Sequence, residues 1–281
     1  MSAKTDQLLP TLTPGLLYLW TMRTDDLDIE TLSRVEAILP TDDQKEARRF
    51  RRNKDRQQFL LARGLLRFAL SEHLPVCATD WRFARNQNHK PFIIAPKSFS
   101  AVNFSLSHTN GLIACLISLV AEAAVDVEKI EFQDDLGPVA KQVLSAVELT
   151  ALRKLSGQDW TKRFFDYWTL KEAYAKAKGL GLRLPLNDIG FDIETDNAIR
   201  ARFLNDSSAW VFWCHHLSPH YTISVAANAE TVAGYEIICR SVNFDKRGPS
   251  SISAGGTLYF NSVENDRVFL TLDPIRTAVH A

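Results

Sequence analysis

The chain lacks the features that mark several large classes of protein. Its four cysteines occur singly, none forms a CxxC pair and none lies near a histidine cluster, which argues against zinc or disulfide frameworks. Lys+Arg and Asp+Glu each total 33, so net charge gives no reason to expect a nucleic-acid or membrane partner. The longest apolar run, 112–121, is too short to span a bilayer. No basic segment followed by an apolar stretch begins the chain, so we expect a cytoplasmic protein.

The 281 residues suffice for one large domain or two small ones, and the pattern of apolar residues predicts both helices and strands. Helices are expected at 28–39, 41–52, 55–70, 138–155 and 161–178. Strands are expected at 16–21, 81–85, 92–95, 104–107, 112–119, 123–130, 189–193, 209–215 and 221–227.

The predicted order of elements suggests two similar halves. Strand, helices and strands follow one another in residues 1–119 and again in 123–229, with a junction near 120–122. No residue-level repeat accompanies this order. Residues 230–281 form an extension of unknown role, which we expect to be a hairpin or a partly ordered tail.

One predicted strand carries two acids. Asp126 and Glu128 alternate with Val125 and Val127, so both carboxylates face one side of the strand and both valines face the other. Same-face neighbours lie about 6–7 Å apart at the backbone, close enough for both carboxylates to reach one divalent ion. The alternative is a half-solvated strand with two surface acids.

A second acid and a base share one face of the predicted helix 161–178. Glu172 and Lys176 are four residues apart, and on an exposed helix such a pair would be a weak surface salt bridge. The surrounding residues are mostly aromatic, leucine or alanine, so little of this helix is free to face water. A cation beside Glu172 and a phosphate beside Lys176 would supply the partners that a buried acid and base need.

Three carboxylates around one site would repel one another unless protonated or bound to a cation. Oxygen ligands favour a hard ion such as Mg²⁺, which keeps waters and binds substrate phosphates. His108 and Lys90 are further phosphate-binding candidates, although each alone would be an ordinary structural histidine or turn lysine.

These motifs together resemble the signature of the Sfp-type 4′-phosphopantetheinyl transferases. The resemblance covers about residues 15–229 and includes Ser107-His108, the Asp126-x-Glu128 pair and the WxxKExxxK pattern at 168–176, with support from 48–50 and 62–67. It implies an α+β, pseudo-twofold, two-subdomain fold, each half a small mostly antiparallel sheet packed on helices. Coenzyme A would bind in the cleft between the halves, with nucleotide contacts in 1–119 and the metal site and catalytic helix in 123–229.

The resemblance also assigns roles to single residues. Magnesium-binding acids are implied at Asp126, Glu128 and Glu172, and a lysine near the diphosphate at Lys176, with Glu172 and Lys176 as catalytic candidates. Coenzyme contacts, including the 3′-phosphate, are implied at Lys90, Ser107 and His108, and more loosely at Lys54. The family commonly has glycine where this chain has Ala124.

The activity implied is Mg²⁺-dependent transfer of the 4′-phosphopantetheine arm of coenzyme A to a serine of an acyl or peptidyl carrier protein, with release of 3′,5′-ADP. The resemblance also favours a monomer. The region 132–144, with Phe132, Leu136 and Val139, is a candidate surface for carrier docking. Two alternatives are a Mg²⁺-dependent nucleotide-diphosphate hydrolase and a non-catalytic module that binds coenzyme A or carrier protein.

Overall fold

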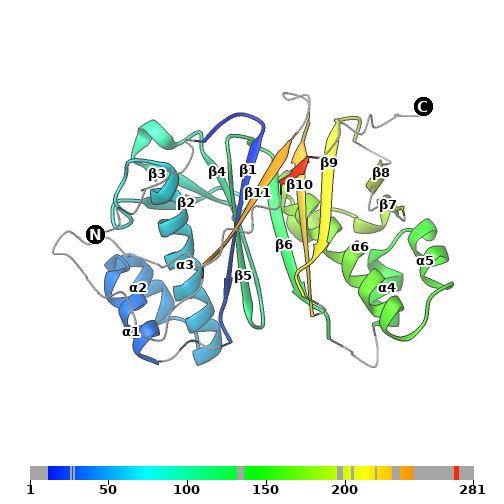
Figure 1. Ribbon diagram of the computed structural model, residues 1–281, viewed down its shortest axis with the longest axis horizontal. Helices are drawn as coiled ribbons and strands as arrows, with labels where there is room; N and C mark the ends of the chain where they lie inside the picture. Colours follow the sequence, from blue (N-terminus) through cyan, green and yellow to red (C-terminus); the bar gives the residue numbers. More distant parts are fainter. Residues whose placement is uncertain are drawn as a thin grey trace, which may run out of the picture.

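A computed structural model describes residues 12–25, 27, 29–131, 136–194, 199–203, 206–218, 220–229, 235–242 and 269–271. Two β-sheets face each other at the centre of the molecule, and helices cover their outer faces (Figure 1). The predicted α+β class, with mostly antiparallel sheets packed on helices, is confirmed. None of the described helices is long and apolar enough to cross a membrane.

The first sheet has five strands in the order β12 (Phe269–Thr271), β11 (Glu236–Val242), β1 (Leu16–Arg23), β5 (Leu112–Ser118) and β4 (Asn103–Thr109). Strand β1 alternates, so that Tyr18 and Trp20 pack on one side while Leu17 and Leu19 pack on the other. The long helix α3 (Asn53–His73) covers the Tyr18 side, together with α1 (Ile29–Ile38) and α2 (Thr41–Ala47). A two-stranded ribbon, β2 (Arg82–Arg85) with β3 (Pro91–Ala95), flanks this half.

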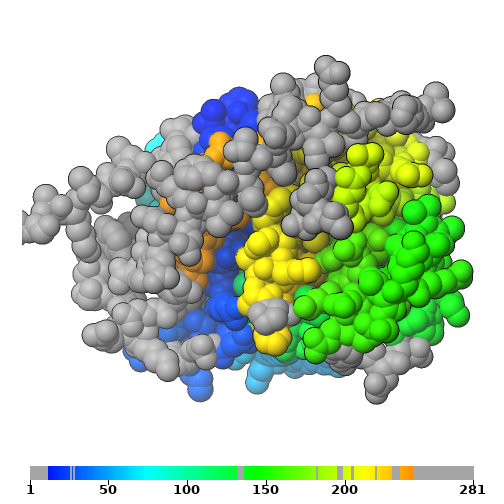
Figure 2. Space-filling view, turned by 45° about the vertical axis from the view of Figure 1, so that its right-hand side comes forward, coloured from blue at the N-terminus to red at the C-terminus, as the bar shows by residue number. Residues whose placement is uncertain are grey.

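The second sheet has three antiparallel strands, β6 (Ala123–Lys129), β10 (Tyr221–Asn228) and β9 (Trp210–His216). Helix α6 (Gly157–Lys178) packs on its outer face and ends at Gly179, whose positive φ of 67° caps the helix. Helices α4 (Gly137–Val143) and α5 (Ala146–Leu152) and the ribbon β7 (Ile189–Ile193) with β8 (Ile199–Phe203) complete this half. In the space-filling view, these green helices lie against the yellow strand residues (Figure 2).

The inner faces of the two sheets form a common apolar core. Leu17 and Leu19 of the first sheet meet Val125, Val127 and Ile223 of the second. Strand β11 adds Ile237 to this core while it pairs in parallel with β1. The predicted extension 230–281 thus contributes the strands β11 and β12 to the first sheet. The predicted division into 1–119 and 123–229 stays a prediction.

Helix α2 is shorter than predicted, because it ends at Ala47 rather than near Arg52. In residues 48–52 the only apolar side chain is Phe50, which is 40% exposed and contacts Phe59, so a continued helix would have no apolar face to bury. The N-cap position belongs to Pro40 rather than to Thr41, and no side chain caps this helix.

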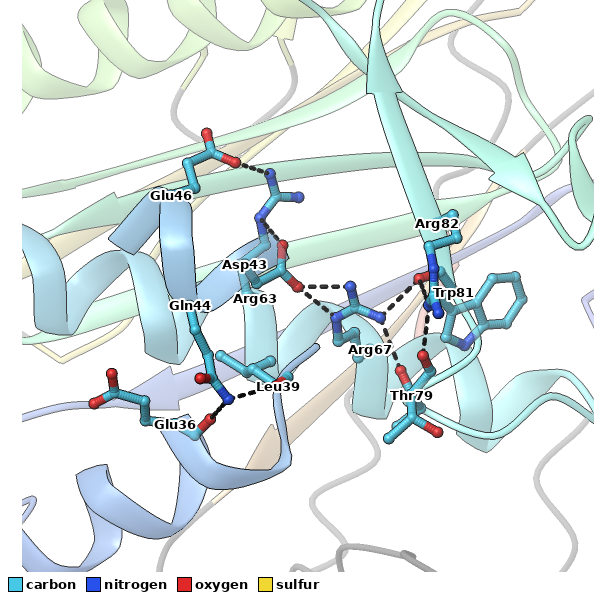
Figure 3. A network of polar contacts seen from close by, with 11 residues as sticks. Glu36, Leu39, Asp43, Gln44, Glu46, Arg63, Arg67, Thr79, Trp81 and Arg82 are labelled. Atoms are coloured by element: carbon cyan, nitrogen blue, oxygen red, sulfur yellow. Dashed lines mark hydrogen bonds and ion pairs between the residues drawn. The ribbon is translucent and has the colours of Figure 1, made fainter. Parts of the chain in front are cut away.

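A buried ionic network fixes α2 against α3. Arg67 donates to Asp43 through Nε (2.8 Å) and Nη2 (2.6 Å), and its Nη1 reaches the carbonyl of Trp81 (2.9 Å), as Figure 3 shows. Arg63 lies beside the same carboxylate and Glu46. The arginines of the 62–67 motif therefore hold the first half together.

Candidate functional site

Three segments from both halves meet at one carboxylate. The Ser107 hydroxyl of β4 donates to Asp126 Oδ1 of β6 at 2.8 Å. Lys176 of α6 donates to the same Oδ1 at 2.5 Å and to Ser107 Oγ at 2.9 Å. The structure thus brings together one member of each of the three sequence motifs.

The alternation predicted for β6 is confirmed and explains why its acids face α6. Val125 and Val127 are buried between the two sheets, so Asp126 and Glu128 point the other way, toward the helix. Asp126 is only 3% exposed, which excludes the alternative of a simple surface acid. Ala124, where the family commonly has glycine, packs its methyl group in the core beneath α6.

The site carries more negative charge than its protein partners satisfy. Asp126 Oδ2 is buried and has no hydrogen-bond partner among the described residues. Burial, then repulsion from Asp126, raises the pKa of Glu128 to about 7, although hydrogen bonds with Thr109 and Trp168 oppose the shift. Burial and Asp126 also raise the pKa of Glu172, and Lys176 opposes this. Both raised pKa values indicate a place where a cation would be stabilised.

A hard cation fits this donor set. The atom without a partner is a carboxylate oxygen, and the two acids whose pKa values Asp126 raises are oxygen donors as well. No group of three His, Cys, Asp or Glu side chains in the described part of the chain is already close enough to hold a metal. The trio Asp126, Glu128 and Glu172 therefore stays a prediction, with Asp126 as its best-supported member.

His108 follows Ser107 on β4 and faces outward. Although much of the residue is exposed, partial desolvation of its ring and then the Lys176 cation lower its pKa. Asp55 of α3 and Asp126 act in the opposite direction. His108 thus lies within electrostatic reach of both the acid site and the start of α3.

The two remaining predicted coenzyme contacts lie at helix ends. Lys90 Nζ donates to the carbonyls of Ala121 and Ala177, both at 3.3 Å, so it lies across the C-terminal end of α6. Burial lowers the pKa of Lys90, and Glu122 opposes the shift. Lys54 is exposed in the first turn of α3.

Thr109 is a residue of the site that was missed from the sequence, since it donates a hydrogen bond to Glu128 Oε2 at 3.2 Å. Lys171, which belongs to the WxxKExxxK pattern, forms a fully buried ion pair with Glu148 at 2.9 Å. A signal for Thr109 was present, because Asn103, Ser105, Ser107 and Thr109 place a polar residue at every second position of a strand.

Comparison with known proteins shows the family of the chain. A family model described as "4′-phosphopantetheinyl transferase superfamily" matches residues 123–226, and one described as "4′-phosphopantetheinyl transferase, N-terminal" matches 28–121. The 4′-phosphopantetheinyl transferase HetI of Nostoc sp. is 32% identical over 172 residues, which cover 61% of this chain and 72% of HetI. The chain belongs to the 4′-phosphopantetheinyl transferase family.

More distant relatives cover more of the chain. A phosphopantetheinyl transferase of Thraustochytrium sp. is 26% identical, covering 73% of this chain and 75% of its own. The 4′-phosphopantetheinyl transferase Sfp of Bacillus subtilis is 24% identical, covering 72% of this chain and 87% of its own. A solved holo-(acyl-carrier-protein) synthase of Bacillus anthracis, in complex with CoA (3′,5′-ADP), covers 39% of this chain and 96% of its own, at 17% identity and a TM-score of 0.36.

Proposed function

We propose that this protein transfers the 4′-phosphopantetheine arm of coenzyme A to a serine of an acyl or peptidyl carrier protein, releases 3′,5′-ADP and depends on Mg²⁺. The observation that carries the proposal is the buried Asp126, which Ser107 and Lys176 contact through one oxygen while the other has no protein partner. This arrangement, in a member of the transferase family, suits a cation that binds a diphosphate.

Asp126, Glu128 and Glu172 would hold the ion, and Lys176 would lie beside the diphosphate. When bound, Mg²⁺ would offset the charge that develops on the leaving group. Lys176 would add a fixed positive charge beside the diphosphate, because its ammonium group lies 2.5 Å from Asp126 Oδ1 at the proposed metal site.

The transfer itself forms one P–O bond and breaks another. The serine hydroxyl of the carrier attacks the β-phosphorus, the bond to the bridging diphosphate oxygen breaks, and 3′,5′-ADP leaves with the electron pair. The hydroxyl proton must be removed, and Glu172, one helical turn from Lys176, is our candidate base, directly or through a water molecule.

We place coenzyme A along the junction of β4, β6 and α6. Ser107, His108 and Lys90 would contact its phosphates from this junction, and Lys54 would approach from the first turn of α3. The protein would act in the cytoplasm as a monomer.

The carrier protein would dock beside this junction, and 132–144 is the candidate surface. Phe132 lies outside the described residues. Leu136 is buried in the core of the second half, whereas Val139 is 37% exposed and available for contact.

The test is the intact mass of several purified apo carrier proteins after incubation with the protein, coenzyme A and Mg²⁺. A gain of one phosphopantetheine unit on the carrier serine is expected, and 3′,5′-ADP should appear only when a carrier is present. Release of ADP without a carrier would instead support the nucleotide-diphosphate hydrolase. Coenzyme A binding without modification of any carrier would support the binding module.

A further inference from the structure

The junction between the two sheets is made by side chains of β4 rather than by backbone pairing. Backbone N–H groups of Val125, Val127 and Lys129 donate to hydroxyl oxygens of β4, at 3.2, 3.3 and 3.2 Å. The acceptors in chain order are Ser105, Ser107 and Thr109. Partners are always 20 residues apart, so the two strands run parallel in a constant register. We call the three acceptor residues of β4, Ser105, Ser107 and Thr109, the hydroxyl ladder.

Each hydroxyl that accepts a backbone N–H still has one proton to donate. Ser107 gives its proton to Asp126 Oδ1 at 2.8 Å, and Thr109 gives its proton to Glu128 Oε2 at 3.2 Å. In both cases the carboxylate belongs to the β6 residue that precedes the N–H donor. Asp126 precedes Val127, and Glu128 precedes Lys129. Ser105 follows the same geometry, but the residue in the corresponding position is Ala124, which has no polar side chain.

We propose that Thr109 is a positioning residue for the metal site, holding Glu128 in place through the hydroxyl ladder. The inference rests on the proposed function, because it assigns Glu128 to the cation. One further contact fixes Thr109 itself, and the turn after it is tightly packed. Gln58 Nε2 of α3 donates to its carbonyl at 3.0 Å, and Gly111, in the turn that follows, has a positive φ of 91°. A Cβ added at Gly111 would come within 2.2 Å of the Tyr221 hydroxyl, so the turn packs tightly against the second half.

Ser107 is less suitable as a test of this idea. Its hydroxyl donates to Asp126 and accepts from Val127 N and Lys176 Nζ. Its substitution would disturb Lys176 as well as the carboxylate. Among the described residues, no hydrogen bond joins Thr109 to Lys176, so a change at Thr109 acts on Glu128 without disturbing the lysine.

The experiment measures Mn²⁺ binding, without turnover, by titration calorimetry or electron paramagnetic resonance in the presence of coenzyme A. Thr109→Val keeps the shape of the side chain but removes both of its hydrogen bonds, and Mn²⁺ affinity should fall about tenfold, as is typical when a residue that orients a metal ligand is lost. Thr109→Ser restores the hydroxyl and should return affinity to within about threefold of the unchanged protein.

Ser105→Ala is the matched control. It removes the same kind of bond to a β6 N–H but faces no carboxylate, so it should lower the unfolding midpoint about as much as Thr109→Val while Mn²⁺ affinity stays within about twofold. A Thr109→Val protein that binds Mn²⁺ as tightly as the unchanged protein would overturn the inference, as would an equal loss of affinity in Ser105→Ala.

This outcome is separable from that of the proposed function. If the unchanged protein binds Mn²⁺ and Thr109→Val weakens binding, the role of Thr109 stands even when no carrier protein is modified. If carriers are modified but Thr109→Val leaves Mn²⁺ affinity unchanged, the transferase assignment stands and the positioning role is wrong.

Discussion

Two lysines of helix α6, Lys171 and Lys176, each pair with a carboxylate from another element. The two pairs differ in how completely protein groups use their hydrogen-bonding capacity. Lys171 and Glu148 are both 0% exposed and 2.9 Å apart. Lys171 also donates to the carbonyls of Leu186 and Ile189. Glu148 accepts from Ser145 N at 2.7 Å and from Phe191 N at 3.0 Å. Every charge in this pair is matched by protein groups.

The second pair leaves bonding capacity unused. Lys176 and Asp126 lie 2.5 Å apart, but the lysine side chain is 31% exposed and Asp126 Oδ2 has no partner among the described residues. A saturated buried pair is expected to fix structure, because removal of one partner strands a charge. An unsaturated buried carboxylate needs another explanation, and a ligand supplies one. We therefore propose that the Lys171–Glu148 pair is structural and the Lys176–Asp126 pair is functional.

The largest stability effect should come from Lys171→Met. Methionine fills a similar volume but leaves Glu148 as an uncompensated buried anion, which typically costs about 3–5 kcal/mol. We expect the free energy of unfolding in denaturant to fall by that amount. Glu148→Gln in the same chain should recover part of the loss, because it removes the stranded charge. An unchanged midpoint for Lys171→Met would mean that this pair is not the structural member of the comparison.

The second substitution acts on the other pair. Asp126→Asn keeps an acceptor for the Ser107 hydroxyl but removes the charge that would bind the cation and that repels Glu128 and Glu172. Carrier modification should slow by about 10²–10³-fold, equivalent to roughly 3–4 kcal/mol of activation free energy. The free energy of unfolding should stay within about 1 kcal/mol of the starting value.

A coupled assay of ADP release and a denaturant melt on the same sample decide this prediction. Full activity in Asp126→Asn would remove Asp126 from the metal site. A stability loss as large as that of Lys171→Met would instead make both pairs structural.

The contrast also shows what sequence could reveal. The two-residue alternation of Asp126 and Glu128 with valines fixed which way the acids face, since a strand has only two sides. Glu172 and Lys176 share a helix face by their spacing, so their common side of the helix was predictable as well, and the family resemblance implied their approach to Asp126. The partner of Lys171 was not, because Glu148 lies on another helix and no local spacing relates the two.

Pairing between distant segments explains most of the other features that were not predicted from the sequence. Strand β11 pairs in parallel with β1 from more than two hundred residues away, and no local feature of either segment indicates which strand it pairs with. The short strand β8 was not predicted, although Ile199, Ala201 and Phe203 alternate with Arg200 and Arg202 as in a half-buried strand. The hydroxyl ladder needed the register of β4 against β6, which only the folded chain supplies.

A third cluster, in which Tyr174 and Lys178 of α6 contact Asp206, gives an intermediate case. Burial alone would raise the pKa of Asp206, but hydrogen bonds with Ser208 and Tyr174 and the nearby Lys178 lower it to about 2. The folded-state pKa lies below the ordinary value of 3.8, so this carboxylate stabilises the fold above that value. Its contribution is lost as pH falls from 3.8 toward about 2.

Asp206→Asn should therefore lower the free energy of unfolding by about 1–2 kcal/mol at pH 7. The difference from the unchanged protein should shrink as the pH approaches 2. Parallel denaturant melts from pH 7 to pH 2 measure it. A difference that does not vary with pH would show that packing, rather than the charge of Asp206, accounts for the effect.

The smallest expected effect concerns Ser145, which caps the helix that carries Glu148 of the saturated pair. Ser145 caps α5, with its hydroxyl accepting from the N–H of Glu148 at 3.4 Å while the Glu148 carboxylate accepts from Ser145 N at 2.7 Å. Ser145→Ala removes the hydroxyl but leaves the backbone bond to Glu148, so a loss of about 1 kcal/mol in unfolding free energy is expected. Carrier modification should be unchanged, because Glu148 keeps Lys171 and Phe191 as partners and the Asp126 site is untouched. Ser145→Thr retains a capping hydroxyl and serves as the control. A slower transfer in Ser145→Ala would mean that the two pairs communicate along α6, and the separation drawn between them would fail.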